Sequence, residues 1–518
     1  MKNKILSFLQ LLLLVGIIHA NGLVFAKEKF PQGKATYQAL NVDENDPFVI
    51  SFGTSMSQTH QTSNTVHPDH IRKVLHTIAG QQADPQAWLA SKNRIWYVLR
   101  SLPTVACSHC STVLDPSSLN PEKNKLLIKR LIKDLASNQS ADKLTMTRCL
   151  KCSHKGSLTE QQLTQSTLSP AHLQAMIAQI DHLNVNQQSG CQKCALPNYR
   201  ISLEACDILK NDSIEIDQDK LQAQAKWLKQ IGNPMIFLHH YANPSCIPNL
   251  FEKPEHAEWF ANYCSQVVSA SPQITHICPI SQLVAFGFRV KRQTLPPFQA
   301  TLDQDEYFKN IVQAHVQASK KIKALNPKIQ VLISHQWKPM KPKHGLGDPR
   351  QLLEMFICSI ASRMYNGKFA SLMQPHTQHF DGIALSLYPA MHFNLWVAEG
   401  DNCSGKIDAQ SALESIVETA KAFPGKDIYI AETGCNTPDA QTKKDFIDMT
   451  LHVCKLARDK GIPVKGIYFW GHTNDPEFYS EWNSAPGSCH FGPFEKLDPE
   501  RPCASMNAAG KHIKEILN

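Results

Sequence analysis

One carboxylate stands where a buried strand would present it to a ligand. The segment Ile428-Tyr-Ile-Ala-Glu-Thr-Gly434 places Glu432 at the end of a short apolar run, directly before a turn-forming Thr-Gly pair. In parallel α/β folds the C-terminal strand ends face the ligand, so an acid there could act as a nucleophile or carry a proton. A solvated loop acid is the competing interpretation, and the other strand ends must decide between the two.

Short apolar runs alternate with longer amphipathic stretches from about residue 198 onward. Together with one earlier run, they predict eight strands at 48–52, 199–203, 234–238, 274–280, 330–333, 380–387, 427–431 and 464–470. Helices are predicted at 172–183, 217–231, 255–269, 304–325, 349–364, 409–422 and 443–460, with a last one ending near 516. Strands that alternate with helices indicate a parallel sheet, and eight such units predict an α/β fold of the closed (β/α)8 barrel type.

The chain of 518 residues is predicted to consist of four segments. Residues 1–26 are a signal peptide, and 27–58 form an N-terminal segment with the first barrel strand. Residues 59–167 are a Cys-containing insertion in the first strand–helix loop, and 168–518 are the rest of the barrel. Loops on that side surround a barrel's active site, so the insertion is expected to form a wall or lid, or to be a stabilising decoration.

The N-terminus has the pattern of an export signal. Lys2 and Lys4 precede an apolar stretch, and Val24-Phe-Ala26 offers small residues for cleavage. A membrane anchor is the alternative, but the stretch is broken by Ser7 and Gln10 and is short for a span. We therefore predict a periplasmic or secreted protein that has no membrane contact after cleavage.

Composition narrows the classes of partner and cofactor. The net charge of +8 is spread thinly, with no basic run interleaved with aromatic residues, which argues against nucleic-acid binding. Sixteen cysteines in an exported chain favour disulfides, because such compartments keep thiols oxidised. A structural zinc site remains the alternative to disulfides. The zinc ligands would be Cys107, Cys110, Cys149 and Cys152, which form two pairs with metal-like spacing. No other cofactor is expected.

The predicted strand ends share polar and aromatic side chains. Arg200 lies in the second strand, the third ends in His239-His240, the sixth in Tyr388 and the eighth in Trp470. Sugar hydroxyls require paired donors and acceptors, and pyranose faces stack on aromatic rings. Each residue alone is explained by a structural role, but their convergence on one face of a barrel indicates a carbohydrate or glycoside as the partner.

These strand ends resemble glycoside hydrolase family 1, the β-glucosidase family of the (β/α)8 clan A. The resemblance is patchy and covers most of 48–482 outside the insertion. Ile430-Ala-Glu-Thr-Gly434 is similar to I-T-E-N-G, which implies that Glu432 is the nucleophile. Leu183-Asn-Val-Asn186 with Tyr199-Arg-Ile-Ser-Leu-Glu204 resembles L-G-V-N-x-Y-R-F-S-I-E-W, and Ala384-Leu-Ser-Leu-Tyr388 resembles G-x-N-Y-Y. The resemblance thus implies that Arg200 braces the nucleophile and that Tyr388 hydrogen-bonds to it.

The same resemblance implies a set of sugar ligands. Phe52-Gly-Thr-Ser-Met-Ser-Gln58 is similar to A-T-S-x-x-Q, and Phe237-Leu-His-His-Tyr-Ala-Asn-Pro244 to T-L-H-H-W-D-L-P. Gly466-Ile-Tyr-Phe-Trp470 and the acids after it resemble the eighth strand of the family. The implied substrate-binding residues are Gln58, His240, Trp470, Asp475 and Glu477.

The fourth strand departs from the family pattern. Cys278-Pro-Ile-Ser-Gln-Leu283 resembles T-P-V-N-E-I, so Ser281-Gln282 replaces Asn-Glu. The retaining mechanism uses two carboxylates about 5 Å apart, and a glutamine cannot deliver a proton. General acid–base help contributes roughly a hundred- to ten-thousand-fold in rate. A shift in register cannot recover the acid, because no Glu lies between Glu258 and Glu306.

Two functions remain open. The first is an exported retaining β-glycosidase with Glu432 as nucleophile, a missing or relocated general acid, and Ser281 in place of the Asn that contacts the sugar 2-hydroxyl. Its substrate has a leaving group that departs without protonation, or Glu204 or His239 replaces the acid. The second is a catalytically inactive carbohydrate-binding or interaction protein. The stretch 380–389 also resembles endo-galactanases of the same clan.

Overall fold

The computed structural model describes most of the barrel and small parts of the insertion. The described residues are 48–55, 105–107, 113–114, 126–131, 158–160, 174–176, 178–179, 199–291 and 303–517. Gaps within the last two ranges are 211–212, 232–233, 241–242, 245, 248–249, 346, 396, 400–406, 475–489 and 496–499. The predicted signal peptide, Gln58, Asp475 and Glu477 therefore lie outside the described residues.

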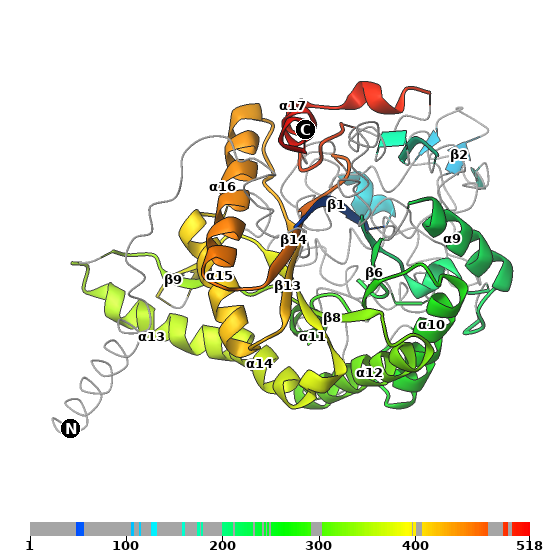
Figure 1. Ribbon diagram of the computed structural model, residues 1–518, viewed down its shortest axis with the longest axis horizontal. Coiled ribbons are helices and arrows are strands. Elements are labelled where there is room, and N and C mark those ends of the chain that lie inside the picture. Colours follow the sequence, from blue (N-terminus) through cyan, green and yellow to red (C-terminus); the bar gives the residue numbers. More distant parts are fainter. Residues whose placement is uncertain are drawn as a thin grey trace.

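Eight parallel strands form a closed barrel, as the alternation of strands and helices predicts (Figure 1). They are β1 Val49–Ser55, β5 Arg200–Ser202, β6 Met235–Phe237, β7 His276–Cys278, β8 Gln330–His335, β10 Gly382–Leu387, β13 Asp427–Thr433 and β14 Val464–Trp470. The order around the barrel is β1-β14-β13-β10-β8-β7-β6-β5, and pairing between β1 and β5 closes it. All eight strands coincide with predicted apolar runs, and the predicted barrel is confirmed.

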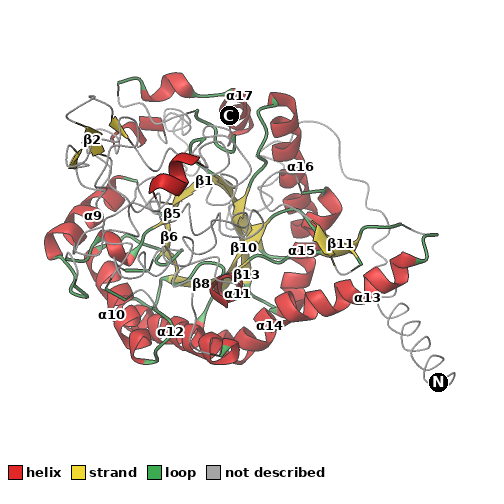
Figure 2. Cartoon of the chain, turned by 180° about the vertical axis from the view of Figure 1, so that it is seen from behind, coloured by secondary structure: helices red, strands yellow, loops and turns green. Residues whose placement is uncertain are grey.

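Helices surround the strands as an outer layer (Figure 2). They are α9 Gln218–Gln230, α10 Glu255–Ala270, α11 Leu283–Lys291, α12 Gln304–Leu325, α13 Arg350–Ser362, α14 Lys368–Met373, α15 Ala409–Ala422, α16 Ala440–Asp459 and α17 Ala508–Leu517. Asp217, Asp408 and Asp439 cap α9, α15 and α16 by accepting hydrogen bonds from first-turn N–H groups. The sequence pattern does not predict α11, because its uninterrupted apolar stretch lacks a clear helical period.

The barrel interior is apolar in its middle and becomes polar towards the C-terminal ends of the strands. Side chains from six strands make the apolar layer: Met235, Phe237, Cys278, Leu332, Ala384, Tyr429, Ala431 and Tyr468. A larger apolar core lies between the strands and the helices. The inward positions beyond this layer include Ser202, Ser334, Ser386 and Trp470, so the C-terminal end of the barrel is where ligand chemistry can occur.

Two small sheets lie outside the barrel, and the sequence predicted neither. One joins β9 Met340–Pro342, β11 Met391–Asn394 and β12 Val397–Glu399, from the chain that follows β8 and β10. Together with α13, this sheet extends to one edge of the molecule in both views (Figures 1 and 2). The other joins β2 Val105–Cys107, β3 Val113–Leu114 and β4 Leu158–Glu160, all within the predicted insertion.

Seven cysteines whose side chains the structure describes carry thiols and form none of the expected disulfides: Cys246, Cys264, Cys278, Cys358, Cys435, Cys454 and Cys503. Burial raises the pKa of the Cys454 thiol to about 12, so it behaves as a small apolar side chain. Within the described ranges no cluster of His, Cys, Asp or Glu could hold a metal ion. Cys110, Cys149, Cys152 and the side chain of Cys107 lie outside the described residues, so the choice between zinc and disulfides there stays a prediction.

None of the described helices combines the length and the apolar character that crossing a bilayer requires.

Candidate functional site

A β-bulge turns Glu432 into the barrel. Tyr429 and Ala431 belong to the apolar layer inside the barrel, so strict alternation would point Glu432 outward. The pairing with β10 moves from Leu385↔Ile430 to Ser386↔Glu432, which leaves one extra residue on β13. The pairing with β14 shows the same extra residue. A bulge at this point redirects the side chain, so the carboxylate faces the barrel interior.

Two partners hold the Glu432 carboxylate. Arg200 Nη2 lies 3.3 Å from Oε2, and the Tyr388 hydroxyl donates to Oε1 at 2.7 Å. Arg200 is fully buried, with its guanidinium 4.2 Å from the centre of the Phe237 ring and 4.9 Å from that of Trp470. A buried carboxylate requires such partners, and charge-assisted bonds are the strong ones. The structure therefore brings together Glu432, Arg200 and Tyr388, residues that lie far apart in the sequence.

His240 extends this group along the barrel wall. Its ring lies edge-on to Trp470 with centres 6.0 Å apart, and Nδ1 is 3.0 Å from Ser202 Oγ. The buried Glu204 carboxylate accepts hydrogen bonds from the His240 backbone N–H at 3.0 and 3.2 Å. Glu204 is thereby engaged in holding the chain after β6, and this role argues against its use as the relocated acid.

His239 points away from the site. Its Nε2 lies 2.9 Å from Asn243 Oδ1, and its ring contacts Phe251 and Phe260 in the layer between strands and helices. Burial lowers the pKa of His239 to about 4. A neutral ring in the outer layer cannot protonate a leaving group inside the barrel, so the suggestion that His239 replaces the missing acid is wrong.

The neutral, buried state of His239 predicts a loss of stability in acid. The pKa of His239 is about 4 in the folded protein and has its ordinary value of 6.5 in the unfolded chain. Between these two pH values only the unfolded chain binds the proton. Stability contributed by this residue is therefore complete above pH 6.5 and falls as pH drops towards 4. The full difference is about 3 kcal/mol. We expect His239→Gln to flatten the fall of Tm with acidification, measured by calorimetry.

The matched control is His392→Gln, because His392 is exposed on β11. The control should follow the wild-type curve. An equal acid slope for wild type and His239→Gln would show that the proton is taken up elsewhere.

Gln282 faces the same part of the barrel as Glu432. Its Nε2 donates to Ser386 Oγ at 3.3 Å, and Ser386 is the residue that pairs with Glu432 across β10 and β13. Gln282 is buried and has a φ of 44°, in the left-handed region. A non-glycine residue there costs roughly 1–3 kcal/mol and is concentrated at functional sites. Gln282, which the resemblance to family 1 places at the acid position, thus lies in the candidate site.

Further polar groups complete the barrel mouth, and sequence reasoning had singled out only one of them. Ser281 Oγ is buried and has no hydrogen-bond partner among the described residues. Ser334 Oγ and Gln336 Nε2, from β8 and the residue just after it, share that property. For Ser334 and Gln336, the signal that could have identified them was the change from apolar to polar residues after Ile333, at the end of the fifth predicted strand.

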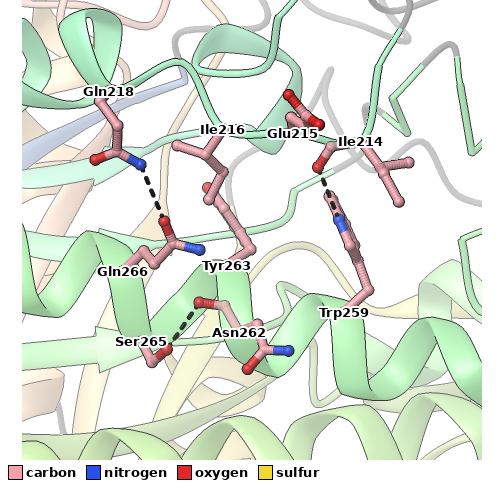
Figure 3. A pocket seen from close by; sticks show the side chains of 9 residues that line it. All are labelled: Ile214, Glu215, Ile216, Gln218, Trp259, Asn262, Tyr263, Ser265 and Gln266. Carbon is pink, nitrogen blue, oxygen red and sulfur yellow. Dashed lines mark hydrogen bonds between the residues drawn. The ribbon is translucent and has the colours of Figure 1, made fainter.

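A separate groove lies on the outer surface (Figure 3). It has a volume of about 550 Å³ and lies between α10 and the segment before α9. Its polar groups satisfy each other: Trp259 Nε1 donates to the Ile214 carbonyl at 3.1 Å, and Gln218 Nε2 donates to Gln266 Oε1 at 3.2 Å. None of the groups that contact Glu432 lines it, so it is not part of the candidate site.

Comparison with known proteins supports the fold. No family model and no curated protein matches the sequence. Among solved structures, β-glycosidase BGL167 aligns with a TM-score of 0.52 and 16% identity over 67% of this chain and 86% of that one. A β-glycosidase from Pyrococcus horikoshii aligns with a TM-score of 0.52 and 16% identity, over 65% of this chain and 85% of that one. A family 1 β-glucosidase from Thermotoga maritima aligns with a TM-score of 0.51 and 14% identity, over 65% of this chain and 86% of that one.

The chain shares its (β/α)8 barrel fold with these β-glycosidases. Identities of 14–16% establish the shared architecture, a (β/α)8 barrel, and nothing about activity. What the chain does must therefore be argued from its own side chains.

Proposed function

We propose that this protein is an exported retaining β-glycosidase that works without a general acid. The arrangement that carries the proposal is the Glu432 carboxylate, held by Arg200 and Tyr388 inside the C-terminal end of the barrel. Tyr388 holds one oxygen of this carboxylate and Arg200 the other, and together they fix its orientation towards the barrel interior. His240, Ser281 and Trp470 are the described side chains that would bind the sugar, with Gln58, Asp475 and Glu477 as further ligands. The proposal that the protein is exported is based on the N-terminal pattern of charged, apolar and small residues.

The chemistry follows from a nucleophile that has no proton donor opposite it. A Glu432 oxygen attacks the anomeric carbon as the bond to the leaving atom breaks, and the electron pair stays on that atom. Gln282 stands where a retaining enzyme has its acid, and a carboxamide gives up no proton at neutral pH. The substrate class is therefore a glycoside whose leaving group is stable as an anion, such as an acidic phenol or thiol.

The second step is expected to be slow. Water must attack the glycosyl ester of Glu432, and Gln282 cannot remove its proton as a carboxylate would. The covalent intermediate should therefore accumulate, with a burst of released leaving group.

Trapping this intermediate tests the proposal. A fluoro-sugar glycoside with a dinitrophenyl leaving group should add one glycosyl mass to the intact protein, and peptide mapping should place it on Glu432. Label on another residue, or none across a panel of sugars, would contradict the proposed nucleophile.

A carbohydrate-binding protein without catalysis is the second candidate, and Gln282 is the observation that favours it. That function predicts sugar binding by calorimetry with neither burst nor label. The same trapping experiment therefore separates the two candidates.

A further inference from the structure

Gln336 points into the barrel from the residue directly after β8. Leu332 belongs to the apolar layer inside the barrel, so Ser334 and Gln336 follow it on the inward face. His335 stacks on Phe369 in the outer core, with ring centres 4.1 Å apart. Trp337 packs against the same core and lies edge-on to His335. With both neighbours directed outward, the Gln336 side chain must face the interior.

This placement puts Gln336 beside Gln282 and Ser386. β8 lies between β7 and β10 in the barrel, and Gln282, which follows β7, reaches Ser386 on β10. Ser334 pairs with Ala384, so the next inward residues of these two strands are Gln336 and Ser386. Ser386 in turn pairs with Glu432. Two carboxamides thus line the side of the site where a retaining glycosidase would protonate its leaving group.

The Gln336 amide nitrogen is unsatisfied. Its side chain is 3% exposed, and Nε2 has no hydrogen-bond partner among the described residues. Leaving a buried donor unpaired costs about 1–3 kcal/mol, so such groups in native proteins serve a purpose such as ligand binding. The ligand at this position must be a hydrogen-bond acceptor.

We propose that Gln336 Nε2 donates a hydrogen bond to the departing atom of the substrate and stabilises the negative charge that develops there. This inference rests on the proposed glycosidase function. As the Glu432 oxygen bonds to the anomeric carbon, the bond to the leaving atom breaks and its electron pair moves to that atom. The amide keeps both hydrogens, and the anion takes its proton from solvent after release. Donors aimed at developing charge, rather than a transferred proton, thus assist the departure.

A series of aryl glycosides that differ in the acidity of the phenol tests this role. Gln336→Met keeps the size of the side chain and removes the donor. Its kcat/KM should fall by on the order of 100-fold for phenols of low acidity, the scale for removal of one donor to an oxyanion. Dinitrophenyl glycosides should change little, because the ring already disperses the charge. A plot of log(kcat/KM) against leaving-group acidity should become steeper.

Controls keep the outcomes distinct. Gln351→Met, on α13 away from the barrel interior, should leave the plot unchanged, and Gln336→Leu, which also lacks the donor, serves if the Met variant does not fold. A slope equal to that of the wild type in a folded Gln336 variant overturns the role of Gln336 while the glycosidase stands. A wild type that releases no phenolate and takes no label at Glu432 overturns both proposals.

Discussion

Glu432→Gln is expected to lower kcat/KM for a dinitrophenyl glycoside by about 10⁴-fold or more, the scale for loss of a covalent nucleophile. The amide retains the size of the carboxylate and can still accept the Tyr388 hydrogen bond, but it cannot form the glycosyl ester. The initial release of dinitrophenolate, followed in stopped flow, should lose its burst. Because Arg200 then lacks its buried counter-ion, Tm should also fall.

The matched control is Glu418→Gln on α15, whose carboxylate pairs with Lys421 at the surface. It removes a carboxylate without touching the barrel interior and should keep both the burst and Tm. A Glu432→Gln protein that retained the burst would place the nucleophile elsewhere and end the proposed mechanism.

Gln282→Glu should act in the opposite direction. It restores a carboxyl group on the side of the site facing Glu432, and general acid–base catalysis contributes roughly 10²- to 10⁴-fold. The gain should appear with alkyl glycosides and with disaccharides, whose leaving groups must be protonated. Dinitrophenyl substrates gain only in the second step, where the new carboxylate can activate water. Steady-state rates on both classes, measured in parallel, report the two effects separately.

Gln282→Met serves as the comparison, because it also alters the left-handed position but supplies no acid. It should bring no gain on either class. If Gln282→Glu folds and gains nothing on disaccharides, Gln282 is not at the acid position, and the carbohydrate-binding function becomes the better account.

Under the proposed mechanism, Gln282 and Gln336 together account for catalysis without a general acid. The two carboxamides would line the same side of Glu432 and replace proton transfer by hydrogen bonding. Such a site is restricted to substrates that leave as anions, and it gains chemical selectivity from that restriction.

Periodicity in the sequence was sufficient to predict the barrel. A buried parallel strand is a short apolar run, and a covering helix is an amphipathic stretch, so both leave local signals. The small sheet of β9, β11 and β12 left no such signal. β9 and β11 are short and only partly buried, and their pairing depends on contacts between distant segments.

Side-chain direction is where local patterns failed. Phe237 lies inside the barrel, so alternation would place His239 inside as well, yet the chain turns after β6 and His240 takes that position. Glu432 shows the same effect, because only the bulge in β13 turns it inward. The resemblance to family 1 had pointed to His240 and Glu432, but the periodicity of the strands could not.

The sequence by itself thus determined the order of strands and helices, the acid at the end of the seventh strand, and the glutamine in place of the second acid. Those features depend on residue type and on neighbours along the chain. Only the tertiary structure decided that Arg200 and Tyr388 hold Glu432, that Glu204 and His239 are engaged elsewhere, and that the Gln336 amide nitrogen is buried without a partner among the described residues. Bulges, closure of the barrel and the burial of each polar group arise from pairing between segments far apart in sequence, and no local pattern encodes them.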